Sequence, residues 1–361
     1  MKKELIILLH GPLTKNEFAN FGIDYLRKNF NVSIFDISQL VKSTYYQYKK
    51  IYRFPIIKTF EELDTIFSKK ENAMCWEVGF SINSFRIYKL IRRNNLKTIS
   101  IDGICSIPSS KEHKERVGLI HRLNKRLKVF LFNPSIFIKR ISFYIGAKIR
   151  DWRYKKTDIV ILGGKASNLF PGYSGAQHKI VSSSFDYGNY LIQKKKKKFK
   201  NKKNFAVFID TYLLFHPEHA ETTNLLYDRK KYFKSLINFF NIFQKETNLE
   251  VIIALYPKAN IKKYPKEFKK FKMISGKTLK LVEASKIVLH QGSTAQSFAV
   301  ICKKPTIFLT SNEMEKYKYI HDHGEKVKFM GSKVLNVDNI DYKILKSKKL
   351  LFHYNKNLYK K

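Results

Sequence analysis

The sequence has few cysteines and no long uninterrupted apolar run. Its three cysteines, Cys75, Cys105 and Cys302, form no Cys-x-x-Cys pair among 361 residues. This excludes a disulfide scaffold and a structural zinc site, and it favours a reducing compartment such as the cytoplasm. The longest stretch without Asp, Glu, Lys or Arg runs from Ile287 to Cys302, and it contains His, Gln, Gly, Ser and Thr. It is too short and too polar for a membrane-spanning helix.

The N-terminal apolar run is also short. Leu5 to Leu9 follows two lysines and a glutamate, and no small-residue cleavage site comes after it. A signal-peptide core is longer than this. We therefore expect the run to form the first buried strand of the fold.

Acidic residues are scarce. There are 29 Asp and Glu against 70 Lys and Arg, so the formal net charge is +41. Heavy use of Lys, Ile, Asn, Phe and Tyr is typical of an AT-rich genome and accounts for part of the excess. The rest predicts an anionic partner such as a membrane surface, a phosphorylated substrate or nucleic acid. No nucleic-acid-binding motif is present, and the basic residues are spread along the chain, so nucleic acid is the weakest of these.

Hydrophobic residues make up 44% of the chain, which is enough for packed cores. Short apolar runs alternate with longer helical patterns, as expected for parallel sheets covered on both faces. We predict an α/β protein with two doubly wound, Rossmann-like domains facing a cleft. Strands are expected at 5–9, 32–35, 73–76, 98–101, 159–162, 205–209, 251–255, 287–289 and 306–309. Helices are expected at 18–29, 229–247, 278–284 and 294–301.

A lysine-rich segment at 191–204 has little to bury and marks the best domain boundary. The length agrees with about two domains. The expected organisation is an acceptor-binding domain at 1–190, a basic linker at 191–204, a nucleotide-binding domain at 205–340 and a C-terminal helix at 341–361. That last helix is expected to cross back to the first domain.

Ligands of doubly wound sheets bind beyond the carboxyl ends of the strands. The strongest such signal is a buried strand that ends at His290 and is followed by Gln291, Gly292, Ser293 and Thr294 before a helix. Glycine allows close backbone approach, and a Ser or Thr N-cap with free N–H groups can bind an anion. This pattern predicts a phosphate or nucleotide site, although Ser and Thr also cap many ordinary helices.

Two further strand ends of the second half carry polar residues. Tyr256, Pro257 and Lys258 form a turn in which Lys258 either holds an anion or is simply solvated. Asp210 ends the strand at 205–209, and His216 follows in a loop with another histidine and a glutamate. The spacing is not that of a helical zinc motif, so we expect a loop over the cleft and no metal.

The first half offers weaker candidates at its own strand ends. Asp102 precedes a glycine and is placed either to accept a proton from an acceptor hydroxyl or to cap a turn. Glu77 lies near another strand end. The remaining candidates are His10, Gly11, Gly163 and Gly164.

Residues 129–153 mix bulky apolar and basic side chains at helical spacing. The pattern suits a helix lying on an anionic membrane surface. It suits equally a helix packed on the core with a solvated basic face, and both interpretations remain open.

Together these motifs resemble GT-B glycosyltransferases of bacterial surface polysaccharide biosynthesis. The features are the Asp-Gly after a first-domain strand, the strand–Tyr-Pro-Lys turn and the strand–His-x-Gly-Ser-Thr–helix turn. They are most similar to the CMP-sugar enzymes: sialyltransferases and related nonulosonate or Kdo transferases. The likeness in architecture covers most of the chain, whereas the motifs cover about twenty residues.

The resemblance implies an inverting, metal-independent transfer from a CMP-linked sugar to a capsule, lipopolysaccharide or other surface glycan, with no cofactor. Asp102 would be the base, and His290 would supply an imidazole because Tyr256 stands where the family has histidine. The implied nucleotide site comprises Tyr256, Pro257, Lys258, Glu283 for the ribose, Gln291, Gly292, Ser293 and Thr294. The enzyme would lie on the inner face of the plasma membrane, near a lipid-linked acceptor.

Three alternatives are open. A teichoic-acid-type polyol-phosphate transferase would use a CDP donor, with His290 or His216 as the base. A nucleic-acid-binding protein would explain the charge alone. A non-catalytic interaction domain in polysaccharide assembly would explain the fold if the cleft residues proved dispensable.

Overall fold

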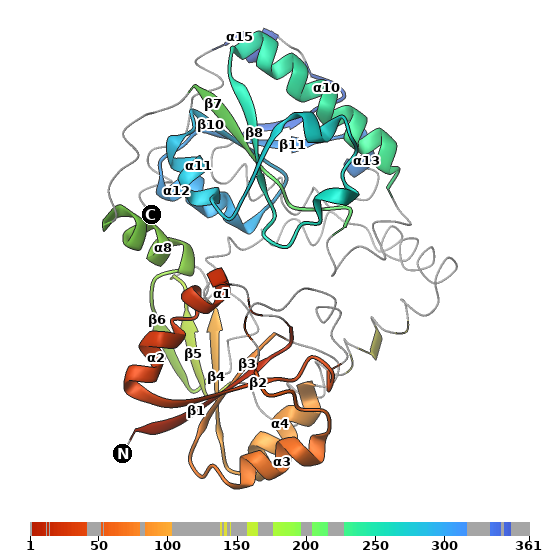
Figure 1. Ribbon diagram of the computed structural model, residues 1–361. Coiled ribbons are helices and arrows are strands. Elements are labelled where there is room, and N and C mark those ends of the chain that lie inside the picture. The colour runs from red at the N-terminus through yellow and green to blue at the C-terminus, as the bar shows by residue number, and fades with distance from the viewer. Residues whose placement is uncertain are drawn as a thin grey trace. The chain divides into compact units, whose positions relative to one another are not determined.

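The chain forms two compact units in the computed structural model (Figure 1). Unit 1 comprises Met1–Ser106 with Lys125–Gly188, and unit 2 comprises Ile107–Asn124 with Asn189–Lys361. The structure describes residues 2–41 except 12 and 14, residue 52, 54–79, 84–102, 157–164, 176–195, 204–215, 227–315, 333–340, 343–347 and single positions between 138 and 145.

Unit 1 is built on six parallel strands in the order β2-β1-β3-β4-β5-β6. The strands are β1 (Lys3–Leu9), β2 (Phe30–Asp36), β3 (Met74–Val78), β4 (Lys97–Asp102), β5 (Ile159–Leu162) and β6 (His178–Val181). The helices are α1 (Lys15–Asn20), α2 (Ile23–Asn29), α3 (Phe60–Ser68), α4 (Ser84–Arg93) and α8 (Phe185–Lys195), the last of which continues into unit 2. The chain runs from β1 to β2 on one side and then crosses to β3 on the other, so the strand order reverses between β1 and β3.

The central strand β1 is buried on both faces, which explains its continuous apolar sequence. Ile6 and Leu8 pack in one cluster with Leu63 of α3 and Ile87 of α4. The alternate residues of β1 pack on the other face with residues of α1 and α2. Helices therefore cover both faces of the unit 1 sheet (Figure 1).

Unit 2 repeats this plan with six parallel strands in the order β12-β11-β10-β7-β8-β9. The strands are β7 (Phe205–Ile209), β8 (Glu250–Leu255), β9 (Lys272–Ser275), β10 (Ile287–His290), β11 (Thr306–Thr310) and β12 (Lys333–Asn336). The α-helices are α10 (Arg229–Thr247), α11 (Thr278–Ala284), α12 (Ser297–Ile301), α13 (Asn312–Glu315) and α15 (Lys343–Lys346), and the 3-10 turns are η4 (Ile261–Lys263), η5 (Phe268–Lys270) and η6 (Thr294–Gln296). The order reverses between β7 and β10.

The long helix α10 supplies the larger core of unit 2. Its residues Leu236, Phe239, Phe240 and Phe243 are buried against one face of the sheet. The helices α11 and α12 pack on the opposite face, for example through Val282. Asp228 caps α10, because its side chain accepts a hydrogen bond from the backbone N–H of Lys231.

The predicted fold class is confirmed: both units are doubly wound α/β sheets. All nine predicted strands form, and three others, β6, β9 and β12, were not predicted. The helix predicted over 18–29 is instead two helices, because Gly22 adopts a left-handed conformation with φ 63°. The predicted linker at 191–204 begins too early, since α8 continues to Lys195 and lysine is a good helix former. Of the predicted C-terminal helix, α15 is described and residues 348–361 lie outside the described part.

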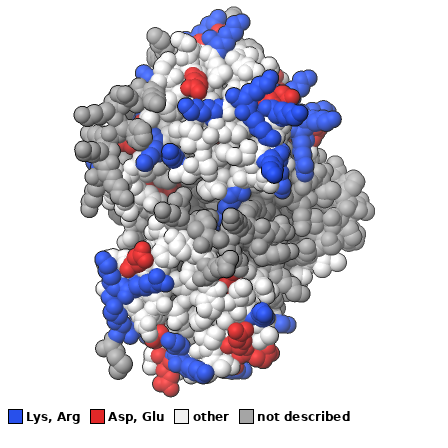
Figure 2. Space-filling model, in the orientation of Figure 1, with Lys and Arg blue, Asp and Glu red and all other residues white. Residues whose placement is uncertain are grey.

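Charge differs between the two units. Among the described residues, Lys and Arg outnumber Asp and Glu by more than two to one in unit 2, whereas the two kinds are nearly balanced in unit 1. In Figure 2 the Lys and Arg side chains of unit 2 gather on the side where α10 lies. The described part of the excess positive charge is therefore concentrated in unit 2.

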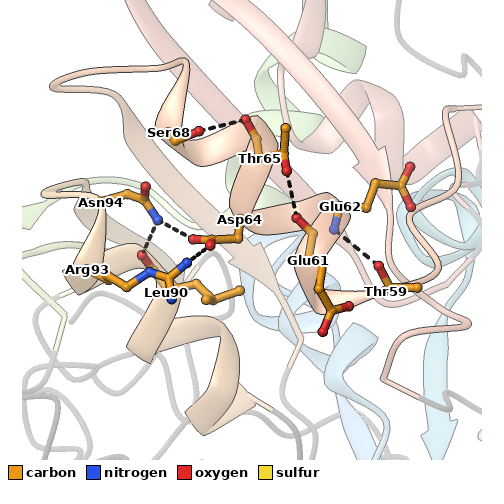
Figure 3. Close-up of polar contacts among 9 residues, drawn as sticks. All are labelled: Thr59, Glu61, Glu62, Asp64, Thr65, Ser68, Leu90, Arg93 and Asn94. Carbon is orange, nitrogen blue, oxygen red and sulfur yellow. Dashed lines mark hydrogen bonds and ion pairs between the residues drawn. The ribbon is translucent and has the colours of Figure 1, made fainter.

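Polar contacts join α3 and α4 on the surface of unit 1 (Figure 3). Thr59 caps α3 by accepting from the backbone N–H of Glu62 at 3.1 Å. Asp64 of α3 pairs with Arg93 and accepts from the Asn94 side chain at 2.7 Å. These contacts fix the two helices that cover one face of β3, the strand that carries Glu77.

Candidate functional site

Each unit has one place where a ligand is expected on topological grounds. In a doubly wound sheet the loops on either side of the strand reversal diverge, and the carboxyl ends of the two strands border an opening. In unit 1 these are the ends of β1 and β3, and in unit 2 the ends of β7 and β10. The polar residues found there form two candidate sites, one in each unit.

The candidate site of unit 1 is a buried pair of titratable side chains. His10 follows β1 directly, and Glu77 lies in β3, paired in register with Leu8. The His10 Nε2 atom is 2.7 Å from Glu77 Oε1, and both side chains are almost completely buried. Ser84, the first residue of α4, donates its hydroxyl to the same Glu77 oxygen at 2.6 Å. The carboxylate is thus held from two sides.

The glycine after β3 makes room for the imidazole. Gly79 has φ 119°, and a Cβ placed there would lie 3.0 Å from Cγ of His10. Any other residue would both strain the backbone and displace the ring. The close approach of Gly79 therefore fixes the position of His10.

This arrangement equips His10 to accept a proton. In a neutral imidazole beside an ionised carboxylate, which only accepts hydrogen bonds, Nε2 carries the hydrogen donated to Glu77 and Nδ1 keeps the lone pair. A carboxylate that orients a histidine and stabilises the imidazolium form is a recurrent device in general-base catalysis. Both residues are predicted from the sequence as candidates at strand ends, but their pairing is not.

The other predicted residues of unit 1 lie along the same edge of the sheet. Gly11 follows His10 and is half-buried. Asp102 is the last residue of β4, paired in register with Leu162, and its side chain lies outside the described part. Gly163 and Gly164 follow β5, and Gly164 has φ 144°. Among all the predicted residues of unit 1, only the side chains of His10 and Glu77 are brought together in the described part of the structure.

The candidate site of unit 2 is organised by Asp210, which follows β7 and is buried. Its Oδ1 accepts from the backbone N–H of Tyr212 at 3.0 Å. Its Oδ2 accepts from the hydroxyl of Tyr264 at 2.5 Å and from the backbone N–H of Tyr256 at 3.3 Å. Desolvation by burial raises the pKa of Asp210, and these three hydrogen bonds oppose that shift.

The turn after β8 is fixed by the same contacts. The ring of Tyr256 stacks on that of Tyr212, with 5.8 Å between centroids and 7° between planes. Tyr212 has φ 54°, a left-handed conformation that is costly for a residue with a side chain. Pro257 is exposed and Lys258 is half-buried. The predicted Tyr-Pro-Lys turn therefore sits beside Asp210 at the strand reversal.

The turn after β10 has the predicted form with a shorter helix. His290 is fully buried, and Gly292 has φ 92°, the left-handed region that favours glycine. Ser293 accepts from the backbone N–H of Ala295 at 3.2 Å and so caps the next element, while Thr294 is exposed. That element is the 3-10 turn η6 followed by the five-residue α12. Its dipole is small, so an anion at this turn would be bound by individual N–H and hydroxyl groups.

Gln291 joins this turn to the helices behind it. It is fully buried, and its Oε1 accepts from the hydroxyl of Tyr232 on α10 at 2.6 Å. Glu313 of α13, also buried, accepts from the backbone N–H of Asp228 at 2.7 Å. Tyr232, Tyr264 and Glu313 were not predicted, because their role arises from contacts across 50 or more residues that no local pattern records.

Three buried oxygen atoms near these turns have no hydrogen-bond partner in the described structure. They are Thr211 Oγ1 after β7, Gln296 Oε1 in η6 and Thr310 Oγ1 at the end of β11. Buried polar atoms are nearly always paired, so each of these three is an exception at a loop that follows a strand.

Two predicted residues fall elsewhere. Glu283 lies in the last turn of α11, which returns from the end of β9 to the start of β10, so it lies at the amino edge of the sheet. There it accepts from the Gln193 side chain at 3.2 Å. The structure thus does not bring Glu283 to the turn after β10, where the predicted nucleotide-binding residues lie. His216, with the loop around it, lies outside the described residues, as do most of residues 129–153.

Within the described ranges no cluster of three His, Cys, Asp or Glu side chains is placed to hold a metal ion. No described helix has both the length and the apolar character needed to cross a bilayer.

Comparison with known proteins supports the fold. No protein-family model and no curated protein matches this sequence. Among solved structures, UDP-GlcNAc 2-epimerase from Methanocaldococcus jannaschii aligns with a TM-score of 0.51 at 12% identity, over 98% of this chain and 94% of that chain. UDP-N-acetylglucosamine 2-epimerase from Rickettsia bellii aligns with a TM-score of 0.52 at 12% identity, over 99% and 90% of the two chains. The chain therefore has a GT-B-like fold of two Rossmann-like units.

Proposed function

We propose that this protein is a nucleotide-sugar-dependent glycosyltransferase of GT-B type. Unit 2 binds the nucleotide at the reversal between β7 and β10, and His10 of unit 1 acts as the base. The single observation that carries the proposal is the His10–Glu77 hydrogen bond at the strand reversal of unit 1. A buried, carboxylate-oriented imidazole at a ligand edge suits proton abstraction from an acceptor hydroxyl.

The proposed reaction is a displacement at the anomeric carbon without a metal ion. Nδ1 of His10 takes the proton of the acceptor hydroxyl, and its oxygen forms the new bond to the anomeric carbon. The bond from that carbon to the donor phosphate oxygen breaks, and its electron pair leaves with the nucleotide. Lys258, the Ser293 and Thr294 hydroxyls and the N–H groups of the Gly292 turn stabilise the departing phosphate.

The nucleotide is proposed to be a pyrimidine nucleotide, for two separate reasons. The Tyr-Pro-Lys and His-x-Gly-Ser-Thr turns resemble those of enzymes that use CMP-linked nonulosonic acids or Kdo. The fold is similar to that of an M. jannaschii UDP-GlcNAc 2-epimerase solved in complex with UDP-GlcNAc and UDP, at a TM-score of 0.51 and 14% identity over 98% of this chain and 94% of that chain. The acceptor is proposed to be a surface glycan or its lipid-linked precursor.

Thermal unfolding with CMP, CDP, UDP, GDP and ADP, with and without magnesium, tests the nucleotide half of the proposal. A nucleotide at about 100 times its dissociation constant adds about 2.7 kcal/mol of stability. Stabilisation by CMP alone supports a CMP-sugar donor. Stabilisation by UDP alone supports a UDP-sugar donor, and stabilisation by CDP alone supports the polyol-phosphate transferase. No stabilisation by any nucleotide in a folded sample overturns the proposal.

Two variants test where the nucleotide binds. Ser293→Ala with Thr294→Ala is expected to abolish most of the stabilisation, whereas Ser68→Ala in unit 1, which removes an exposed hydroxyl at the end of α3, is expected to leave it intact.

The choice of base is tested by His10→Asn against Asp102→Asn. Loss of transfer in the first alone supports His10, and loss in the second alone supports Asp102.

A second candidate is epimerisation of a UDP-sugar, favoured by the fold likeness to 2-epimerases. Incubation with UDP-GlcNAc in the absence of any acceptor separates the two activities. An epimerase converts the sugar, and a transferase leaves it unchanged or releases UDP slowly to water.

A further inference from the structure

The 3-10 turn η4 is a rigid part of unit 2, although it lies on the surface. At its start, Asn260 caps the turn by accepting from the backbone N–H of Lys262 at 3.0 Å, and its own N–H donates to the Tyr212 hydroxyl at 3.1 Å. At its end, Tyr264 donates to the buried Asp210. These contacts fix the backbone of the turn, from which the exposed side chains of residues 261–263 extend.

This rigid turn presents an aliphatic side chain between cations. Ile261 is 49% exposed, and Lys262 and Lys263 beside it are exposed. A large apolar residue held out in water by a structured turn gives no stability to the unit itself. Alone it is an ordinary surface residue, and it is informative only together with the cations that surround it.

The beginning of α10 lies against the same turn. The Arg229 guanidinium is 5.2 Å and the Lys263 ammonium 5.8 Å from the centroid of the Phe215 ring, so the two cations share one buried ring. Lys230 follows Arg229 and is exposed. We call Arg229, Lys230, Ile261, Lys262 and Lys263 the basic face. It lies on the α10 side of unit 2, where Figure 2 shows Lys and Arg gathered.

The described acidic residues near the basic face do not balance its charge. Asp228 is engaged as the cap of α10, and Glu313 is buried and accepts from the backbone N–H of Asp228. Glu267 is one exposed carboxylate against four cations. Asp210 is buried among its tyrosine contacts. The face therefore keeps a positive potential that attracts anions.

We propose that the basic face binds the surface of an anionic lipid bilayer. Lysines and arginine would contact the lipid phosphates, and Ile261 would enter the boundary between headgroups and acyl chains. Single-stranded nucleic acid is disfavoured, because such sites combine cations with exposed aromatic rings for stacking. Here the aromatic residues behind the face, Phe215 and Tyr264, are buried.

This inference extends the proposed function by naming the surface that would bring the enzyme to a lipid-linked acceptor. Its test measures lipid binding alone and does not depend on which nucleotide, if any, unit 2 binds. The full chain is sedimented with vesicles of pure phosphatidylcholine and with vesicles in which phosphatidylglycerol replaces part of it.

Wild type is expected to bind the phosphatidylglycerol vesicles and not the neutral ones, with affinity that falls as salt rises. Lys262→Glu with Lys263→Glu is expected to weaken binding by about 25-fold or more, since each basic residue near the surface is worth about fivefold. Ile261→Ser is expected to weaken it a few-fold. Nucleotide stabilisation should be unchanged in all these variants, which separates failure of this inference from failure of the proposed function.

The matched control is Lys245→Glu with Lys286→Glu. It makes the same change in net charge with two exposed lysines at the amino edge of the unit 2 sheet, at the end of α10 and before β10. An equal loss in both double variants would show diffuse attraction by net charge and overturn the proposal. So would absence of vesicle binding by wild type, including the case where an RNA oligonucleotide binds instead.

Discussion

The Nε2 atom of His10 lies 2.7 Å from Oε1 of Glu77, across the point where the strand order of unit 1 reverses. The two residues are 67 positions apart in the chain, and the parallel register of β1 and β3 brings them together. The proximity follows from topology, because the crossover to β3 leaves the ends of both strands side by side. The proposed chemistry of unit 1 rests on this pair.

Glu77→Gln tests the pair directly. The amide keeps the size of the side chain but no longer stabilises the positive charge that develops on the ring when His10 takes a proton. We expect kcat to fall about 100-fold with little change in KM, measured with whichever nucleotide sugar the panel identifies.

The double variant Glu77→Gln/His10→Asn should be scarcely slower than His10→Asn alone, because Glu77 acts through His10. Fully additive losses would show that Glu77 acts independently of the imidazole. Ser84→Ala, which leaves the His10 contact in place, is expected to have a smaller effect.

Gly79→Ala tests the position of the imidazole. The added Cβ would approach Cγ of His10 to 3.0 Å at a φ that disfavours alanine, so the ring must move. We expect at least a tenfold fall in kcat while nucleotide stabilisation of unit 2 is retained. Gly276→Ala is the matched control, since that glycine has φ 70° with nothing near its Cβ. Equal losses in both variants would indicate backbone strain alone.

The central strands were predictable because both faces of each are buried, which leaves a continuous apolar run such as Leu5 to Leu9. The strands β6, β9 and β12 were not predicted because they lack this two-sided burial. They lie at sheet edges, and β6, His178–Val181, is exposed at every residue, so its sequence shows no apolar run. Edge strands are specified by their pairing partner more than by their own composition.

The sequence predicts which residues lie at the candidate sites, but it does not predict which side chains form hydrogen bonds with one another. His10, Glu77 and Asp210 stood out as polar residues at strand ends. That Asp210 accepts from Tyr264, 54 residues away, depends on the loop after β8 folding back over β7. No local spacing encodes such a contact, and the same holds for the Tyr232–Gln291 pair.

The raised pKa of Asp210 makes a prediction about pH. Burial, the largest cause, disfavours the ionised form, so the folded pKa lies above the unfolded value of about 3.9. The contribution of this group to the free energy of unfolding is then fully present below about pH 4. It is lost as pH rises through the folded pKa.

Urea unfolding of wild type and Asp210→Asn over a series of pH values checks this. The variant should have a lower free energy of unfolding at every pH, by an amount that does not depend on pH. The reason is that the amide NH₂ group cannot accept the hydrogen bonds that three donors offer to the Asp210 carboxyl group. Wild type should in addition lose stability relative to the variant as pH rises above about 4. A wild-type advantage that grows with pH would contradict the raised pKa.

Asp158 carries the opposite prediction for unit 1. Burial alone would raise its pKa, but hydrogen bonds from the backbone N–H and hydroxyl of Thr98, both 2.7 Å, and an ion pair with Arg92 at 3.0 Å lower it. Its contribution to stability is therefore present above the unfolded value of about 3.9, and it is lost as pH falls through the folded pKa.

Asp158→Asn is expected to cost about 2 kcal/mol at pH 7, because hydrogen bonds to a charged, buried group are lost. The difference from wild type should shrink as the pH is lowered below about 4, measured by urea unfolding. Asp64→Asn, which loses a pair with the largely exposed Arg93 on the same unit, is the control and should cost less than about 1 kcal/mol. If the Asp158→Asn difference is the same at low and neutral pH, the carboxylate is not what joins β4 to the segment before β5.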